Sequence, residues 1–145
     1  MALEVGCGCG SAAAPILRDH DGWRVVAIDF AASAVERLRV RRLDRVEVLL
    51  CDVVKDALPC DGVDVVLCLF VLSSIAPGAL PGVVQKLGAA LKPGGRLLFR
   101  DYGRYDAAQL RFGKGQKTGD HRYVKADGTS CFYFDLGDVS ELFAG

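Results

Sequence analysis

The segment that most constrains the fold is "LEVGCGCG" at residues 3–10, where an apolar run ends in alternating glycines. Ala2–Val5 reads as a strand, and an apolar helical pattern follows over Ser11–Asp19. Glycine adopts positive φ at low cost and lets the backbone approach a ligand closely. A strand that enters a glycine-rich turn at the start of a helix is typical of nucleotide-binding βαβ units. The segment therefore predicts a ligand at the carboxyl end of the first strand.

The rest of the chain alternates short apolar runs with helical patterns, which indicates βαβ units and a parallel sheet. Val63–Val71 is nearly all apolar, as expected of a central strand covered on both faces. An Asp-Gly turn at residues 127–128 separates Tyr123–Lys125 from Cys131–Phe134, which predicts a β-hairpin. The remaining elements are expected as strands at Arg24–Ile28, Val46–Leu50 and Arg96–Arg100, and as helices at Ala32–Arg41, Leu80–Leu91 and Asp138–Phe143.

The charge of the chain is distributed unevenly, although its 145 residues, enough for one domain over 1–145, carry zero formal net charge. Residues 96–125 hold eight Lys or Arg against three Asp or Glu, whereas residues 126–145 hold none against four. A cationic segment of this kind favours an anionic partner. For the arginines between residues 37 and 45 a solvated helix face is the preferred interpretation.

The six cysteines form no CxxC pair and lie mostly in apolar runs, so we expect reduced, mainly buried thiols and no metal site. Reduced cysteines are typical of intracellular proteins, and the expected location is the cytoplasm, with the nucleus and mitochondria as alternatives. The longest apolar run is too short to span a bilayer, so no membrane partner is expected.

Carboxylates follow two of the predicted strands, at the edge of the sheet where the glycine turn lies. Asp29 comes twenty-three residues after Gly6, and Asp52 ends the third strand. Both can accept hydrogen bonds from a nucleotide cofactor, although helix capping is the alternative interpretation for each. A dinucleotide fingerprint, G-x-G-x-x-G, has Ser11 at its last position when counted from Gly6, which disfavours a nicotinamide cofactor. Counted from Gly8 the last position is Ala13, which an alanine-tolerant form of the pattern accepts.

The order E-x-G-x-G-x-G, with Glu4 first, instead resembles motif I of class I S-adenosylmethionine-dependent methyltransferases. The segments "LEVGCG", "LFVLSSI", "LKPGGRLLFRDYGRYDAAQLRF" and "YVKADGT" with a later "YF" occur in the order seen in the methyltransferase-like tRNA 3-methylcytidine methyltransferases. The chain resembles that family over nearly its whole length, and the segment from Arg100 to the hairpin carries the most specific part.

The resemblance implies an α/β, Rossmann-like class I methyltransferase fold with a mostly parallel sheet of order 3-2-1-4-5. It implies a partial domain, shortened at both ends, that lacks the last two strands of the sheet and carries a small β-hairpin after strand five. S-adenosyl-L-methionine is the implied cofactor, held by Glu4, Gly6, Gly8, Asp29, Asp52, Val53 and Leu69. The implied RNA contacts are Arg100, Tyr102, Arg104, Tyr105, Arg111 and Lys114.

The implied reaction is methyl transfer to N3 of a cytidine in the anticodon arm of a tRNA, assisted in some members by a protein partner. N3 has a free lone pair at neutral pH, so orientation matters more than a general base. The base must be unpaired to expose N3, and nearby aromatic rings and cations suit that demand. Asp101 and Asp106 are the candidate catalytic carboxylates, because positive charge passes to the base during transfer.

Two other functions fit the same cofactor motif. A small-molecule methyltransferase would not need the cationic segment, and a non-catalytic remnant would bind cofactor without turnover. The sequence after the fourth strand, "FVLSSI", has neither the N-P-P-Y pattern of amino-group adenine methyltransferases nor the Pro-Cys nucleophile expected for methylation at cytosine carbon 5. A ring nitrogen that needs no activation therefore remains the favoured nucleophile.

Overall fold

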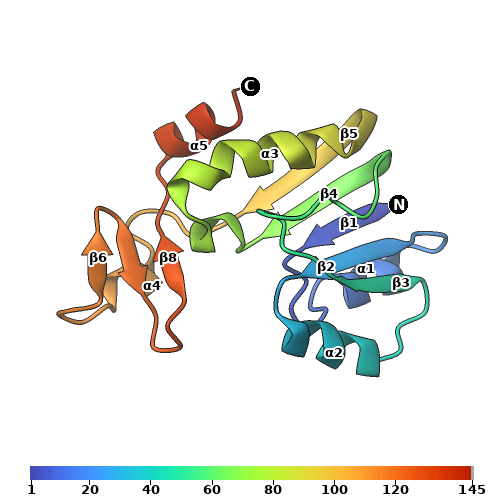
Figure 1. The fold of residues 1–145 in the computed structure, drawn as a ribbon, viewed down its shortest axis with the longest axis horizontal. Helices are drawn as coiled ribbons and strands as arrows, with labels where there is room; N and C mark the ends of the chain where they lie inside the picture. The colour runs from blue at the N-terminus through green and yellow to red at the C-terminus, as the bar shows by residue number, and fades with distance from the viewer. Residues whose placement is uncertain (145) are drawn as a thin grey trace.

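The computed structural model describes residues 1–144 and contains a five-stranded sheet in which every neighbouring pair is parallel (Figure 1). The strand order is β3-β2-β1-β4-β5, as the family resemblance implied. The strands are β1 (Ala2–Val5), β2 (Val25–Asp29), β3 (Val46–Leu50), β4 (Val63–Leu69) and β5 (Leu91–Arg100). Because all five run in the same direction, their carboxyl ends meet at one edge of the sheet.

Helices cover both faces of this sheet. On one face α1 (Ala13–Asp19) and α2 (Ala32–Val40) pack against β1 and β2 through a cluster that includes Leu17, Val25 and Leu38. On the other face α3 (Leu80–Ala89) buries Val83 and Leu87 against the sheet, and α5 (Leu136–Leu142) packs beside it. β1 and β2 are buried along their whole length, which explains why they are apolar except for Glu4 and Asp29.

β5 is an edge strand and begins earlier than the predicted Arg96. Leu91 already pairs with Val63, and the register shifts before Arg96 pairs with Val65. The Pro-Gly-Gly segment at residues 93–95 forms the irregular part, with Gly94 at φ +79°. The segment therefore ends α3 at Ala89, as a helix-stop signal should, but is itself part of the strand.

Beyond β5 the chain forms a second, antiparallel sheet that lies beside the first (Figure 1). The predicted hairpin is present as β7 (Arg122–Val124) and β8 (Ser130–Phe132), but β6 (Lys117–Gly119) adds a third strand that the sequence analysis missed. Between β5 and β6 lies the four-residue helix α4 (Ala107–Leu110). Two short 3-10 turns, η1 (Leu72–Ser74) and η2 (Pro77–Ala79), connect β4 to α3.

No helix within residues 1–144 is both long enough and apolar enough to cross a membrane. All six cysteines in this part of the chain are free thiols. Burial raises the pKa of both Cys7 and Cys68 to about 12, with Asp29 as the next contributor at Cys7 and Asp101 at Cys68. These thiols are therefore protonated at neutral pH and are poor nucleophiles.

Candidate functional site

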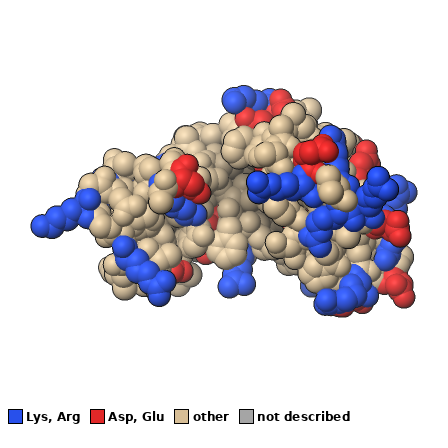
Figure 2. All heavy atoms as spheres, turned by 90° about the horizontal axis from the view of Figure 1, so that it is seen from below, with Lys and Arg blue, Asp and Glu red and all other residues tan. Residues whose placement is uncertain are grey.

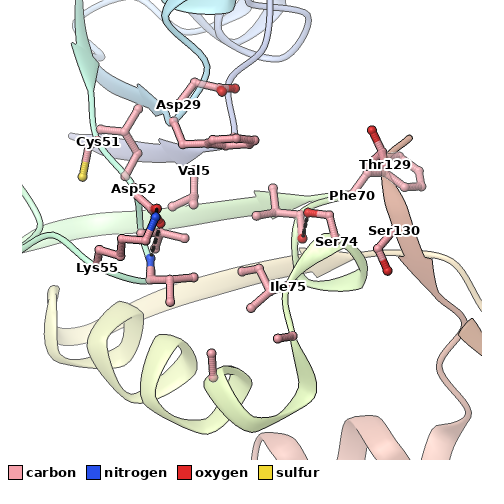
Figure 3. A pocket seen from close by; sticks show the side chains of 18 of the residues that line it. Val5, Asp29, Cys51, Asp52, Lys55, Phe70, Ser74, Ile75, Thr129 and Ser130 are labelled. Atoms are coloured by element: carbon pink, nitrogen blue, oxygen red, sulfur yellow. Dashed lines mark hydrogen bonds and ion pairs between the residues drawn. The ribbon is translucent and has the colours of Figure 1, made fainter. Parts of the chain in front are cut away.

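The carboxyl ends of the parallel strands open into a cavity of about 720 Å³. Gly6, Asp29 and Asp52 line it from the ends of three strands, and Phe70 lines it from the end of β4. Across the cavity from Asp52, on the same side as Phe70, lie residues 127–130, the turn between β7 and β8 with the first residue of β8 (Figure 3). Figure 2 shows the same region as a hollow with few charged side chains, with both basic and acidic side chains on either side of it. A volume of this size suits a small organic ligand.

The glycine turn is held in place by the first of these carboxylates. One oxygen of Asp29 accepts the N–H of Gly8 at 2.9 Å, and the other accepts the N–H of Ala31 at 2.9 Å. Gly8 has φ +52°, and a Cβ added there would meet nothing within 4 Å. Gly6 has φ +65°, and its added Cβ would lie 2.4 Å from Val71 Cγ2. The turn thus needs glycine at Gly6 for space and at both positions for backbone conformation.

Glu4 lies beneath this turn and is 5% exposed. Burial raises the pKa of Glu4 to about 7, the backbone N–H of Ala13 opposes the rise, and the charge of Asp29 adds to it. Its Oε2 is buried without a hydrogen-bond partner among residues 1–144. An orphaned carboxylate oxygen next to an open glycine turn is what a cationic or hydrogen-bond-donating ligand group would satisfy.

The wall at the end of β3 combines charge with apolar surface. Asp52 accepts the N–H of Val54 at 3.0 Å and pairs with Lys55 at 2.9 Å. The Lys55 hydrogen bond is the largest cause that lowers the pKa of Asp52, followed by the Val54 N–H, so Asp52 is an ionised acceptor. Val53 beside it lines the cavity, whereas Glu4, Gly8 and Leu69 do not. After β4 the cavity is lined instead by Phe70 and Val71.

Phe70 lies in the left-handed region at φ +59°, which is rare for a bulky side chain, and is 45% exposed. Its ring contacts that of Tyr102, with 5.0 Å between centroids, and the Arg100 guanidinium lies 5.4 Å from its centroid. Tyr102 in turn packs against the buried Tyr133. Tyr102 is therefore held in an aromatic cluster that joins the two sheets.

The cationic segment divides into residues used internally and residues that remain exposed. Arg104 is 27% exposed and forms ion pairs with Asp135 at 2.8 Å and Asp138 at 3.3 Å. Its charge is therefore already neutralised at the start of α5, where the same carboxylates form a capping box. Tyr105 is 82% exposed, and Arg111 and Lys114 are exposed as well.

The two candidate catalytic carboxylates both serve the backbone and lie outside the cavity lining. Asp101 accepts the N–H groups of Ser73 and Tyr102, each at 2.9 Å. Asp106 is the N-cap of α4 and accepts the N–H of Ala108 at 2.8 Å. Their geometry gives neither a place beside a ligand in the cavity.

The sequence analysis missed several residues that the fold brings to the cavity. Lys55, Ser74, Asp127, Thr129 and Ser130 all line it. The signal for Asp127 and Thr129 was present, because the "ADGT" turn belongs to one of the segments that carried the family resemblance. Arg41 was assigned to a solvated helix face, but its guanidinium donates to the carbonyls of Cys9 and Gly10 at 2.6 and 3.0 Å. It therefore supports the glycine turn.

Comparisons with known proteins agree with this geometry. Residues 3–97 match the family described as "Methyltransferase domain". The chain is 42% identical to the tRNA N(3)-cytidine methyltransferase METTL2 of Mus musculus over 97% of this chain and 39% of that protein. It is 40% identical to METTL6 of Homo sapiens, which has the same description, over 97% of this chain and 52% of that protein. The chain thus spans about two fifths to one half of these relatives.

The fold is also that of known structures. A SAM-dependent methyltransferase from Methanosarcina mazei superimposes with a TM-score of 0.80 at 16% identity, over 99% of this chain and 76% of that one. The Rossmann-like class I architecture expected from the sequence is therefore confirmed.

Proposed function

Because this chain belongs to the methyltransferase domain family, we propose that it transfers a methyl group from S-adenosylmethionine to N3 of cytidine in tRNA. The observation that carries this proposal is the extent of the similarity to the tRNA N(3)-cytidine methyltransferases. That similarity covers 97% of the chain, whereas the general family match ends at residue 97. It therefore includes the cationic segment and the small sheet, whose β7–β8 turn lines the cavity.

The residues present fit S-adenosylmethionine. The open space at Gly8, the orphaned oxygen of Glu4 and the carboxylates of Asp29 and Asp52 supply acceptors for a ligand with an ammonium group and ribose hydroxyls. Apolar surface at Val53 suits an adenine ring. When bound, this cofactor supplies an electrophilic methyl group on a positively charged sulfur.

The chain's own contribution is to orient the nucleophile. The N3 lone pair of the base forms the new bond to the methyl carbon while the carbon–sulfur bond breaks, so the base gains the positive charge that sulfur loses. No proton has to leave N3 before the attack, which agrees with a cavity whose lining, among the residues that the structure describes, includes no histidine. Alignment of the reacting atoms then accounts for most of the rate.

We assign RNA contact to the exposed members of the cationic segment: Arg100, Tyr105, Arg111 and Lys114. Tyr102 supports Phe70 from behind, and Arg104 is omitted because its two carboxylate partners already neutralise it. Each phosphate contact should contribute to the salt dependence of binding. The Arg111→Ala substitution should make the negative slope of log K against log salt shallower by about 0.7 to 0.9. Arg24→Ala, an exposed cation at the amino end of β2, is the matched control and should leave the slope unchanged.

The test of the reaction is transfer of labelled methyl from S-adenosylmethionine to bulk tRNA, followed by digestion and nucleoside analysis. Label should appear in 3-methylcytidine. Label in another nucleoside would contradict the assignment of N3. Cofactor binding by calorimetry without transfer to any tRNA would support a non-catalytic role, and transfer to small amines alone would support a small-molecule methyltransferase.

A further inference from the structure

The cavity has two walls of different origin. One wall consists of the strand ends of the large sheet, with Gly6, Asp29 and Asp52. The other consists of the β7–β8 turn, residues 127–130, together with Phe70 and Ser74. In Figure 3 the Asp52–Lys55 pair lies on one side of the space, and Phe70, Ser74, Thr129 and Ser130 lie on the other. Since the strand ends form the cofactor wall, the turn faces the position left for the substrate.

Three carboxylates line the cavity, and only one belongs to the turn. Asp29 is committed to the N–H groups of Gly8 and Ala31, and Asp52 is paired with Lys55. Asp127 uses its Oδ1 to accept the N–H of Thr129 at 2.9 Å, and the rest of the group is exposed. That hydrogen bond is the largest cause that lowers the pKa of Asp127, so the carboxylate is charged at neutral pH. It is the charged acceptor on the substrate side.

A hydroxyl donor stands on the same wall. Ser130 Oγ accepts a hydrogen bond from the Arg122 guanidinium at 3.1 Å. Because this bond occupies a lone pair, the hydroxyl proton of Ser130 is free to be donated to a ligand. Arg122 is itself fixed over the ring of Phe132, at 5.7 Å from its centroid. The turn therefore offers an acceptor at Asp127 and a donor at Ser130.

We propose that the β7–β8 turn selects the base, with Asp127 accepting a hydrogen from the exocyclic amine of cytosine and Ser130 donating to its O2. This inference rests on the proposed function and deepens it. The two contacts flank N3 and leave its lone pair free. Uracil lacks two of these features. Its O4 would face the Asp127 carboxylate, and its N3 carries a proton and so has no free lone pair. Asp127 also stands where it offsets the charge that the base gains.

The aromatic ring at the same wall has a matching role. Phe70 is partly exposed, lies in a strained backbone conformation and is supported by Tyr102 and Arg100. Strained, partly exposed rings of this kind are kept where the surroundings hold them in place. Phe70 lies on the same side of the cavity as Thr129 and Ser130 (Figure 3), so an extruded base with its edge at Asp127 and Ser130 can stack on its ring.

The test uses two RNA hairpins that differ only in one unpaired loop base, cytosine or uracil. Binding of each to the full chain saturated with S-adenosylhomocysteine is measured by fluorescence anisotropy, and single-turnover methyl transfer is measured in parallel. Asp127→Asn is the informative variant, because asparagine keeps the cap on Thr129 and the Asx-Gly turn. It then presents an amide donor where the carboxylate was, so the preference for cytosine over uracil should fall by on the order of 10-fold.

Controls separate base selection from folding and charge. Asp120→Asn removes the same charge from the same small sheet, but Asp120 is 85% exposed, faces His121 and does not line the cavity. It should leave the preference unchanged. Ser130→Ala should weaken cytosine binding, and neither turn variant should alter the affinity for S-adenosylhomocysteine.

An unchanged base preference in Asp127→Asn would overturn the inference, and so would an equal loss in Asp120→Asn. A loss of S-adenosylhomocysteine affinity in Asp127→Asn would overturn it too, because the turn would then belong to the cofactor wall. These outcomes leave the methyl transfer of the unsubstituted chain as a separate result. Transfer to a nucleoside other than cytidine in that chain would refute the proposed function itself.

Discussion

Replacing Gly6 by alanine tests whether the glycine turn is required by packing against the end of β4 as well as by backbone conformation. An alanine at φ +65° costs about 1–2 kcal/mol from left-handed backbone alone. Its Cβ would also lie 2.4 Å from Val71 Cγ2, an overlap that forces a shift costing about 1–3 kcal/mol. The expected loss in the free energy of unfolding is therefore about 2–5 kcal/mol, a large part of what a domain of this size has.

Gly8→Ala is the matched control, because Gly8 also has positive φ, at +52°, but an added Cβ would meet nothing within 4 Å. Its cost should be limited to the backbone contribution of about 1–2 kcal/mol. Urea unfolding followed by the fluorescence of the single tryptophan, Trp23, gives both values.

A double-mutant cycle isolates the packing contribution. Val71→Ala removes Cγ2, so Gly6→Ala should be less destabilising in the Val71→Ala background by about 1–3 kcal/mol. If the Gly6→Ala variant does not fold, the cycle still tests the packing, because the Gly6→Ala/Val71→Ala double variant should then fold. The reasoning is refuted if Gly6→Ala costs no more than Gly8→Ala, or if the two substitutions are additive.

Three other substitutions test interactions that hold the site. Burial raises the pKa of Glu4 from 4.5 to about 7, so its contribution to stability is full below pH 4.5 and is lost as the pH rises through 7. The stability of Glu4→Gln relative to the unsubstituted chain should therefore grow by about 3 kcal/mol between pH 4.5 and 8 in urea titrations, and a pH-independent difference would contradict this. Arg104→Ala should lower the free energy of unfolding by about 1–3 kcal/mol while leaving the salt slope of RNA binding unchanged; a reduced slope would place its guanidinium on RNA. Arg41→Ala removes two hydrogen bonds to carbonyls of the glycine turn and should lower the free energy of unfolding by about 1–2 kcal/mol in the same urea assay. An unchanged free energy of unfolding would contradict this role of Arg41.

The succession of elements was predictable because it is written in local patterns, whereas the strand order followed from the family resemblance. β1 and β3 have the predicted bounds, and the other predicted strands and helices differ at their ends by a few residues. Apolar runs of strand length, a glycine cluster and a helix-stop signal each act over fewer than ten residues. Of the two departures of substance, the early start of β5 depends on pairing between Leu91 and the distant Val63. The added strand β6 pairs locally with β7, but its three residues, KTG, form no apolar run that would mark a strand.

The candidate site was predictable only in part, for a related reason. The carboxylates Asp29 and Asp52 were identified because parallel topology alone brings strand ends together. The sequence analysis assigned Arg104 to RNA, yet its charge is neutralised by α5, more than thirty residues later in the chain. A basic side chain gives no local sign of the carboxylates that will face it in the folded chain.

By itself, the sequence determined that this chain forms a parallel α/β domain with a glycine turn and acidic strand ends, since backbone preference and hydrophobic periodicity are local properties. Only the tertiary structure decided what closes the cavity. The turn at residues 127–130 reaches a wall formed by β1 to β4 because an aromatic cluster through Tyr102 and Tyr133 fixes the small sheet beside the large one. That docking depends on side-chain packing between segments far apart in the chain, and no window of the sequence contains both partners.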